Sequence, residues 1–235
     1  MSKFFGESNR KKDAMKFPTY LCKRIDRDLN LTGKADDPLW ATAETAVLND
    51  PLTGAPGKFS STAKLLYNEH CLYIAFLCED DYVWGAHTER DAPIWKQECV
   101  EIFICPSGKI RQYFEINVSP RNTVYDSAVL NGTPEDGPHN IISLPQYDTP
   151  GMVTKVHIDG ELGVKGAKGW SAEYAIPFTA LIGANHLVPQ SGDEWRLNLY
   201  RLDSYEENNL DYYAWAEVGK LDFHRPWMFG TLKFA

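Results

Sequence analysis

Short β-rich runs separated by turn residues fill most of this 235-residue sequence, and no long helical period appears in it. Turn residues punctuate the runs at positions such as Asn131-Gly132 and Asp159-Gly160. The runs with strand character lie at residues 65–68, 71–79, 99–105, 111–119, 123–130, 153–158, 170–176, 194–202, 212–218 and 230–234. Apart from one short helical turn expected at 178–182, the pattern predicts an all-β fold, a two-sheet antiparallel β-sandwich of the immunoglobulin or jelly-roll kind.

The length and the connecting segments predict a single domain. A chain of 235 residues suits one large β domain. Residues 135–150 are rich in Pro, Gly, Asp and His, but strand patterns resume after them, so this segment reads as a long surface loop. Residues 1–16 are polar, and we expect them to be mobile. The sequence therefore predicts one domain over residues 17–235.

Charge and cysteine content limit the classes of partner and the compartment. The net charge of −8 argues against broad contact with nucleic acid phosphates or anionic lipid. No stretch approaches the ~20 apolar residues of a membrane span, so we expect neither nucleic acid nor membrane as a partner. The five Cys are an odd number and read as small buried hydrophobes of a reducing compartment. Without an apolar signal region, the sequence as given predicts a cytoplasmic protein, or a secreted one if a signal was removed.

Three strand-like runs each place polar side chains on one face. Glu101 lies within an otherwise apolar run, where a carboxylate is costly unless it is paired, hydrogen bonded or facing a polar cleft. Two other runs alternate between an apolar and a polar face. Their polar faces hold Tyr113, Glu115, Asn117, Arg196, Asn198 and Tyr200. Such mixed donors, acceptors and rings suit a neutral polyhydroxyl ligand, although ordinary solvation of one sheet face would also explain them.

A series of motifs, in order from residue 36 to 235, resembles the family 9 carbohydrate-binding modules. The motifs are Asp36-Asp37-Pro38-Leu39-Trp40, Cys71–Phe76 with Asp80-Asp81, Trp95 with Cys99–Ile104, Glu173–Phe178, Gly192–Asn198, and Phe223–Pro226 with Phe229-Gly230. Each block is weak alone, but the conserved order makes the resemblance specific. It implies a β-sandwich of the cytochrome-domain-like (DOMON-like) type in which two aromatic rings enclose a terminal sugar.

The resemblance also implies roles for particular residues. Trp95 and Glu101 match the family's first sugar-stacking ring and a ligand-bonding glutamate, and Asn117 matches a ligand-contacting asparagine. The family's arginine two residues before that asparagine is Glu115 here. The second ring falls near Phe223 or Trp227, and the sequence does not choose between them.

We therefore expect a non-catalytic module that binds a glycan end or a small saccharide in an aromatic-lined cleft and supports carbohydrate catabolism. The expected ligand-binding residues are Trp95, Glu101, Glu115, Asn117, Arg196, Asn198, Phe223 and Trp227. No cofactor is required. Calcium is a possible structural ion, bound away from the sugar, with Asp36, Asp37, Asp80 and Asp81 as candidate ligands. A glycoside hydrolase on a separate chain is a further expected partner.

Three other functions stay open at this point. A glycoside hydrolase needs two carboxylates across a cleft, which Glu98, Glu101 and Glu115 could supply. A module of the same fold that has lost sugar binding and serves assembly is favoured by the absent arginine. Haem binding, known in relatives of this sandwich fold, would need axial ligands. The available His and Met residues are His157, His224, Met152 and Met228.

Overall fold

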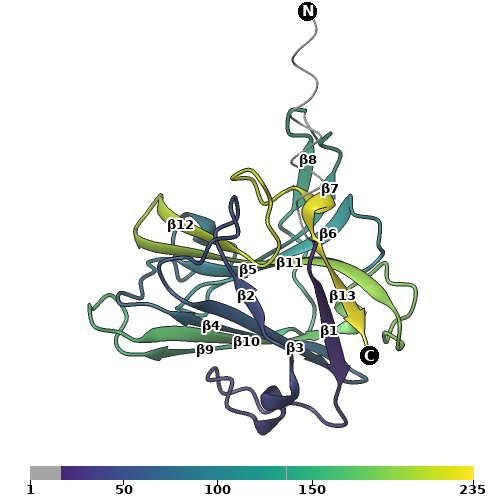
Figure 1. The fold of residues 1–235 in the computed structure, drawn as a ribbon, viewed down its shortest axis with the longest axis horizontal. Helices are drawn as coiled ribbons and strands as arrows, with labels where there is room; N and C mark the ends of the chain where they lie inside the picture. Colours follow the sequence, from purple (N-terminus) through teal and green to yellow (C-terminus); the bar gives the residue numbers. More distant parts are fainter. Residues whose placement is uncertain (1–16, 136) are drawn as a thin grey trace, which may run out of the picture.

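The computed structural model describes residues 17–135 and 137–235, and it forms two stacked layers of β-strands (Figure 1). Residues 1–16, predicted to be mobile, lie outside the described residues. The strands are β1 (Thr19–Arg24), β2 (Ala46–Leu48), β3 (Ser61–Tyr67), β4 (Cys71–Glu79), β5 (Cys99–Cys105), β6 (Gln112–Val118), β7 (Val124–Asn131), β8 (Ile141–Leu144), β9 (Val153–Asp159), β10 (Gly169–Pro177), β11 (Glu194–Glu206), β12 (Asn209–Ala214) and β13 (Gly230–Phe234).

Helical structure in the described residues is confined to short 3₁₀ turns. These are η1 (Pro38–Thr42), η2 (Ile94–Lys96), η3 (Phe178–Ala180) and η4 (Pro226–Met228). The turn expected after Pro177 is therefore present as η3. Within residues 17–135 and 137–235, no helix is long and apolar enough to cross a membrane.

The strands form two sheets that share one strand. Sheet A has the order β8-β7-β6-β5-β11-β13-β1, with β12 beside the far half of β11. Sheet B has the order β1-β3-β4-β10-β9, with β2 beside β3. Strand β1 pairs in parallel with β13 through its first residues and with β3 through its last, and the other pairings are antiparallel. The predicted all-β sandwich is confirmed, with β1 joining the sheets at one edge.

The predicted strands agree with the observed ones where alternation is strong, and differ elsewhere. The runs at 71–79, 99–105 and 230–234 have the bounds of β4, β5 and β13. The run expected at 212–218 was wrong beyond Ala214, where the chain leaves β12. The long loop expected at 135–150 contains edge strand β8, whose mostly exposed residues pair only with β7. An edge strand of this kind carries little alternation because neither face is fully buried.

The main hydrophobic core lies between the two sheets. On β5, Val100, Ile102 and Ile104 point into it, so the residues between them face outward. The outward side is not simply solvated, because residues of the C-terminal segment such as Val218 and Phe229 pack on it with Phe103. This covering segment makes the outer face of sheet A the place where a cavity forms.

Candidate functional site

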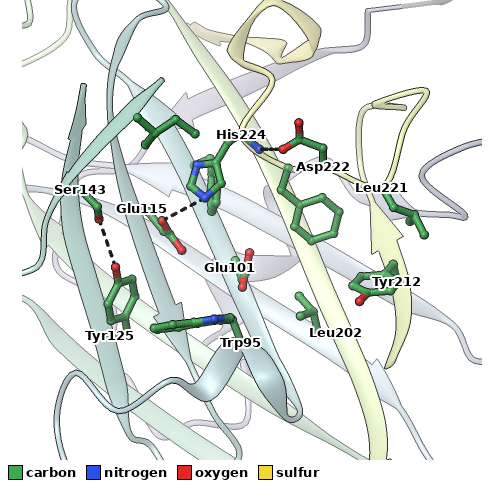
Figure 2. A pocket seen from close by; sticks show the side chains of 13 residues that line it. Trp95, Glu101, Glu115, Tyr125, Ser143, Leu202, Tyr212, Leu221, Asp222 and His224 are labelled. Carbon is green, nitrogen blue, oxygen red and sulfur yellow. Dashed lines mark hydrogen bonds and ion pairs between the residues drawn. The ribbon is translucent and has the colours of Figure 1, made fainter. Parts of the chain in front are cut away.

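A cavity of about 460 Å³ opens on the outer face of sheet A, beneath the C-terminal segment (Figure 2). Strands β5, β6, β7, β8, β11 and β12 all contribute to its walls. The lining residues are Trp95, Glu101, Phe103, Glu115, Tyr125, Ile141, Ser143, Leu202, Tyr212, Leu221, Asp222, Phe223 and His224. The cavity thus combines aromatic rings with carboxylate and hydroxyl groups, and its volume lies within the usual range for small-molecule sites.

Glu101 and Glu115 enter the cavity from neighbouring strands. In the β5–β6 register, Glu101 lies opposite Asn117, and Phe103 lies opposite Glu115. The outward alternation of both strands therefore puts the two carboxyl groups diagonally across one strand pair. Both side chains are nearly out of solvent, with 2% of Glu101 and 6% of Glu115 exposed. Figure 2 shows them pointing into the space between Trp95 and His224.

A single amide group holds the two carboxyls. The Nδ2 atom of Asn117 donates to Oε1 of Glu101 at 3.2 Å and to Oε1 of Glu115 at 3.0 Å. The thiol of Cys99 also donates to Oε1 of Glu101, at 3.6 Å. Asn117 is fully buried and does not line the cavity, so it positions the two acids from beneath.

Burial changes the protonation of this pair. Burial, and then the neighbouring charge of Glu115, raise the pKa of Glu101 well above its usual value. Burial raises the pKa of Glu115 to about 7, although the hydrogen bond from Asn117 opposes the rise. Two carboxylates this close in a dry site cannot both ionise easily. Near neutral pH, the pair therefore offers both acceptor oxygens and a proton.

Aromatic rings form the sides of the cavity. Trp95, on η2, is 37% exposed, and its ring meets Tyr125 edge to face with centroids 4.7 Å apart. Phe223 stacks on Tyr200 with centroids 3.9 Å apart, and Tyr212 contacts it edge to face. Phe223 therefore has one face supported by protein. Partly exposed rings held in this way suit stacking against the C–H face of a ligand.

The C-terminal segment closes the cavity with His224. Nδ1 of His224 lies 2.7 Å from the hydroxyl of Tyr113, and Nε2 lies 3.9 Å from Oε2 of Glu115. Burial lowers the pKa of His224 to about 4, so its ring is neutral near pH 7. Asp222 lies beside it and is already engaged, because His139 approaches its carboxylate at 3.1 Å.

The structure brings together part of the predicted ligand set. Trp95, Glu101, Glu115 and Phe223 line the cavity, and Asn117 supports it from below. Of the two alternatives for the second ring, Phe223 is the one in the cavity wall. These placements locate the side chains and leave ligand contact as a prediction.

Arg196 was predicted to face the ligand, and the structure places it outside the cavity. It lies on the outer face of sheet A as expected, but its guanidinium donates to the backbone carbonyls of Phe229 and Gly230. It does not line the cavity, and it makes no ion pair with the two cavity glutamates. The C-terminal segment covers this end of the sheet, and its backbone carbonyls accept the hydrogen bonds of the Arg196 guanidinium.

Asn198 and Trp227 were also predicted in the site and do not line the cavity. Asn198 is fully buried and donates to the hydroxyl of Tyr200 and the carbonyl of Ala216, so it anchors the covering segment. Trp227 lies on η4, where the guanidinium of Arg225 sits over its ring. Both residues hold the segment above the cavity.

The two carboxyls of the cavity are the pair that the glycosidase alternative would have to use. Glu101 and Glu115 share one amide donor, so they belong to the same wall of the cavity. A glycosidase needs its acid and its nucleophile or base on opposite sides of the scissile bond. Glu98 lies elsewhere, bonded to the indole of Trp170 between the sheets.

The predicted calcium ligands do not converge. Asp37 pairs with Arg27 at 2.7 Å, and this hydrogen bond lowers the pKa of the carboxyl. Asp81 accepts a hydrogen bond from the hydroxyl of Tyr205 at 2.8 Å. Asp36 accepts one from the hydroxyl of a nearby threonine. Among the described residues, none of these three belongs to a group of acids close enough to hold a metal ion.

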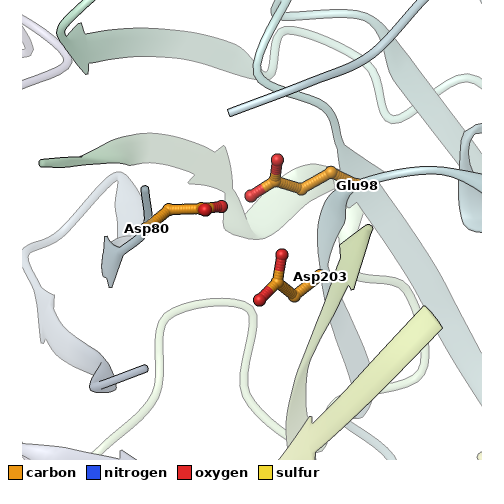
Figure 3. A group of neighbouring side chains, drawn as sticks. All are labelled: Asp80, Glu98 and Asp203. Atoms are coloured by element: carbon orange, nitrogen blue, oxygen red, sulfur yellow. The ribbon is translucent and has the colours of Figure 1, made fainter. Parts of the chain in front are cut away.

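Asp80 belongs to a different, fully buried cluster with Glu98 and Asp203 (Figure 3). Carboxylate oxygens of the three lie within 4.8 Å of one another. Nη2 of Arg201 reaches them at 2.8 Å for Asp80, 3.2 Å for Glu98 and 3.7 Å for Asp203. A guanidinium nitrogen therefore takes the central position that a calcium ion would need. The arrangement fits an internal ion pair network better than a metal site.

A second group of neighbouring acids is also paired with an arginine. Asp91, Asp126 and Asp148 lie close enough to share an ion, but Arg90 pairs with both Asp126 and Asp148. The four candidate haem ligands do not gather at one place, although His224 and Met228 both belong to the C-terminal segment. His157 lies on β9 of sheet B, whereas Met228 packs on the outer face of sheet A.

Several cavity residues were missed by sequence reasoning. Tyr125 and Ser143 come from β7 and β8, and their hydroxyls lie 3.3 Å apart. Tyr212 was assigned to a strand without a role, and His224 was considered only for haem or structural bonding. Alternation on β7 could have placed Tyr125 on the same face as Glu115, but the return of β8 and residues 221–224 over this face has no local signal.

Comparisons with known proteins give one family match and several structural matches. The family model described as carbohydrate-binding family 9 matches residues 59–234. No curated protein matches the chain with significant similarity. Because the structural matches below share less than a quarter of their residues with this chain, they support the fold alone.

Two of the matching structures illustrate this fold. One is a protein from Bacteroides uniformis, provisionally described as carbohydrate-binding, with 18% identity and a TM-score of 0.73; the match covers 94% of this chain and 100% of that chain. The other is a family 9 carbohydrate-binding module from Caldicellulosiruptor kristjanssonii. Its complex with cellotriose has 14% identity and a TM-score of 0.63, covering 92% and 93% of the two chains. The complex with glucose has 16% identity and a TM-score of 0.63, covering 93% and 96%.

Proposed function

The chain belongs to carbohydrate-binding family 9, and from that membership we propose that it is a non-catalytic module that binds a saccharide in the cavity on sheet A. The ligand is a glycan end or a small free saccharide. Trp95 and Phe223 supply stacking surfaces, and the pair Glu101 and Glu115 accepts hydrogen bonds from hydroxyl groups. The proposed role is to support carbohydrate catabolism beside a glycoside hydrolase on a separate chain.

One observation carries this proposal: a cavity of about the size of a sugar is lined by the partly exposed ring of Trp95 and by two buried carboxyl groups, Glu101 and Glu115. Sugars have apolar C–H faces and a rim of hydroxyls, so they need rings and polar groups together. Structural neighbours that were solved with cellotriose and glucose make these two sugars the first ligands to test.

Calorimetric titration of the full chain with glucose and cellotriose tests the proposal. Trp95→Ala should weaken binding at least several-fold, because stacking of one ring contributes on the order of 1 kcal/mol beyond buried area. Its melting temperature should stay near that of the parent, since Trp95 is 37% exposed in the free protein. Phe17→Ala is the control, because this aromatic ring is 48% exposed and lies outside the cavity, so affinity should stay unchanged.

Two outcomes would contradict the proposal. If the parent binds no saccharide in a broad glycan screen, the alternative of an assembly module that has lost its ligand gains support. If a sugar binds and Trp95→Ala retains full affinity, the binding site lies outside this cavity.

A further inference from the structure

We propose that the cavity on sheet A selects amino sugars, with the ligand ammonium placed against the carboxyl groups of Glu101 and Glu115. This inference rests on the proposed function and specifies the class of saccharide. The carboxyl pair faces a cavity that also has exposed aromatic surface, so one ligand can meet both.

The free oxygens of the pair are the first argument. Oε1 of each glutamate accepts from Asn117, which fixes both side chains. Among the described residues, no hydrogen bond reaches Oε2 of Glu101. Oε2 of Glu115 has the neutral ring of His224 nearby, at 3.9 Å. Two acceptor oxygens on neighbouring strands therefore stay available to a ligand with several N–H donors, which an ammonium provides.

The charge of the cavity is the second argument. Glu101, Glu115 and Asp222 all line it, and the described lining residues include no lysine or arginine. Burying two neighbouring carboxylates is costly unless a cation or a proton compensates them. In the free protein a proton can do this, and a bound ammonium can replace the proton. A neutral sugar hydroxyl provides a hydrogen bond but no charge.

The rings contribute to the same preference. A ligand cation near an aromatic face is attracted by the ring quadrupole. Trp95 and Tyr125 meet on one side of the cavity, and Phe223 and Tyr212 meet on another. A sugar ring can stack on one of these surfaces while its ammonium reaches the glutamates on the floor.

Neutral sugars compete as the alternative, because carboxylates also accept hydrogen bonds from hydroxyls. The experiment therefore compares sugars that differ at one substituent. Glucosamine, glucose and N-acetylglucosamine are titrated into the full chain by calorimetry at about pH 6.5, where a sugar amine is mostly protonated. The same comparison with galactosamine, galactose and N-acetylgalactosamine covers the other common epimer.

We expect the amino sugar of at least one series to bind about tenfold or more tightly than its neutral parent and its N-acetyl form, since charge-assisted hydrogen bonds are roughly twice as strong as neutral ones. Glu115→Gln should reduce this ratio to near one. Glu161→Gln, in the exposed turn between β9 and β10, removes the same charge from sheet B and should leave the ratio unchanged.

Proton release gives an independent readout. Titrations in two buffers of different ionisation enthalpy should show a proton leaving the protein as the amino sugar binds, because the ammonium lowers the pKa of Glu115. The other titratable groups that face Glu115 come from β5, β6, β7, β12 and the C-terminal segment, and they are Cys99, Glu101, Tyr113, Tyr125, Tyr212, Asp222 and His224. Burial raises the pKa of the Cys99 thiol and of the three tyrosines and lowers that of His224, so these five keep their protonation at this pH. The released proton therefore comes from the pair Glu101 and Glu115.

The outcomes separate the inference from the proposed function. If glucose or galactose binds as tightly as its amino form, the amino-sugar inference is wrong and carbohydrate binding stands. If neutral sugars bind, the amino form is preferred and Glu115→Gln keeps that preference, the ammonium lies elsewhere and the inference also fails. If no saccharide binds, including cellotriose, the proposed function itself is wrong.

Discussion

Two groups of buried carboxylates lie on opposite faces of sheet A, and they differ in how their charge is compensated. On the inner face, Asp80, Glu98 and Asp203 surround Arg201, which is completely buried. On the outer face, Glu101 and Glu115 share the amide of Asn117 and open into the cavity. The first group has its own cation, and the second has none within the described chain.

This difference indicates that the inner acids stabilise the fold, whereas the outer acids are placed to meet a ligand. Arg201 also donates to Ser61 and to the carbonyl of Glu79, so it ties β11 of sheet A to sheet B. A charge network of that kind holds the sandwich together and is closed to ligands. The cavity pair lines an open cavity and has raised pKa values, which is a common condition of groups that meet a ligand.

The largest expected effect is on the closed cluster. Arg201→Met should lower the free energy of unfolding by roughly 3–5 kcal/mol, because it leaves buried carboxylates without their cation. Chemical denaturation of the parent and the variant measures this loss. Arg27→Met is the control, since Arg27 is half exposed and solvent screens its pair with Asp37, so its loss of stability should be clearly smaller. Equal losses in the two variants would contradict a structural role for the Arg201 cluster.

A smaller effect should appear at Glu115 as a pH dependence. Its pKa of about 7 in the folded protein lies above the usual value of 4.5, so the folded state holds a proton that the unfolded state releases. The Glu115 contribution to stability is therefore complete below about pH 4.5 and is lost as the pH rises through 7. Over that interval the parent should lose up to about 1.4 kcal/mol per pH unit relative to Glu115→Gln.

Urea unfolding of both proteins between about pH 4 and pH 8 measures this difference. Both should retain the same dependence on groups outside the cavity, so the comparison reports on the pair Glu101 and Glu115, which titrate together. A parent that gains stability relative to the variant over this interval would show that Glu115 is ionised and paired in the folded state, contrary to the described cavity.

The smallest expected effect concerns calcium. Because Arg201 occupies the centre of the acidic triad, added calcium should change the melting temperature by no more than about one degree compared with a chelator. Differential scanning fluorimetry measures this shift. A clearly larger stabilisation that Asp203→Asn abolishes would show that calcium displaces the guanidinium and would return the triad to the status of a metal site.

Strand alternation predicted the faces of the sheet correctly but could not predict what covers them. Glu101, Glu115, Arg196 and Asn198 all lie on the outer face, as expected. Two of them are open to the cavity, whereas Arg196 and Asn198 bond to the returning backbone. The difference depends on where the C-terminal segment crosses the sheet, which is a long-range property of the fold.

The Arg201 cluster could not be predicted from the sequence for the same reason, because it depends on contacts between distant parts of the chain. Arg201 lies near the end of the run expected at 194–202, and β11 continues beyond it to Asp203. Nothing local indicates that Asp80 and Glu98 meet these two residues. For Trp95, the resemblance to the family was a better guide than strand alternation. The resemblance rests on the sequence spacing between Trp95 and Glu101, which can be read directly from the chain. In the structure, η2 places Trp95 in the cavity wall.

The central claim is that the outer-face cavity binds saccharide while the inner-face cluster stays closed. Two indole groups report on the two regions: Trp95 lines the cavity, and Nε1 of Trp170 donates to Glu98 in the cluster. Nuclear magnetic resonance of the indole N–H signals, assigned with Trp95→Phe and Trp170→Phe, follows both during titration with glucose, cellotriose and glucosamine. We predict a saturable shift of the Trp95 signal with an unchanged Trp170 signal; a saccharide that binds and moves Trp170 but leaves Trp95 unchanged would contradict the account.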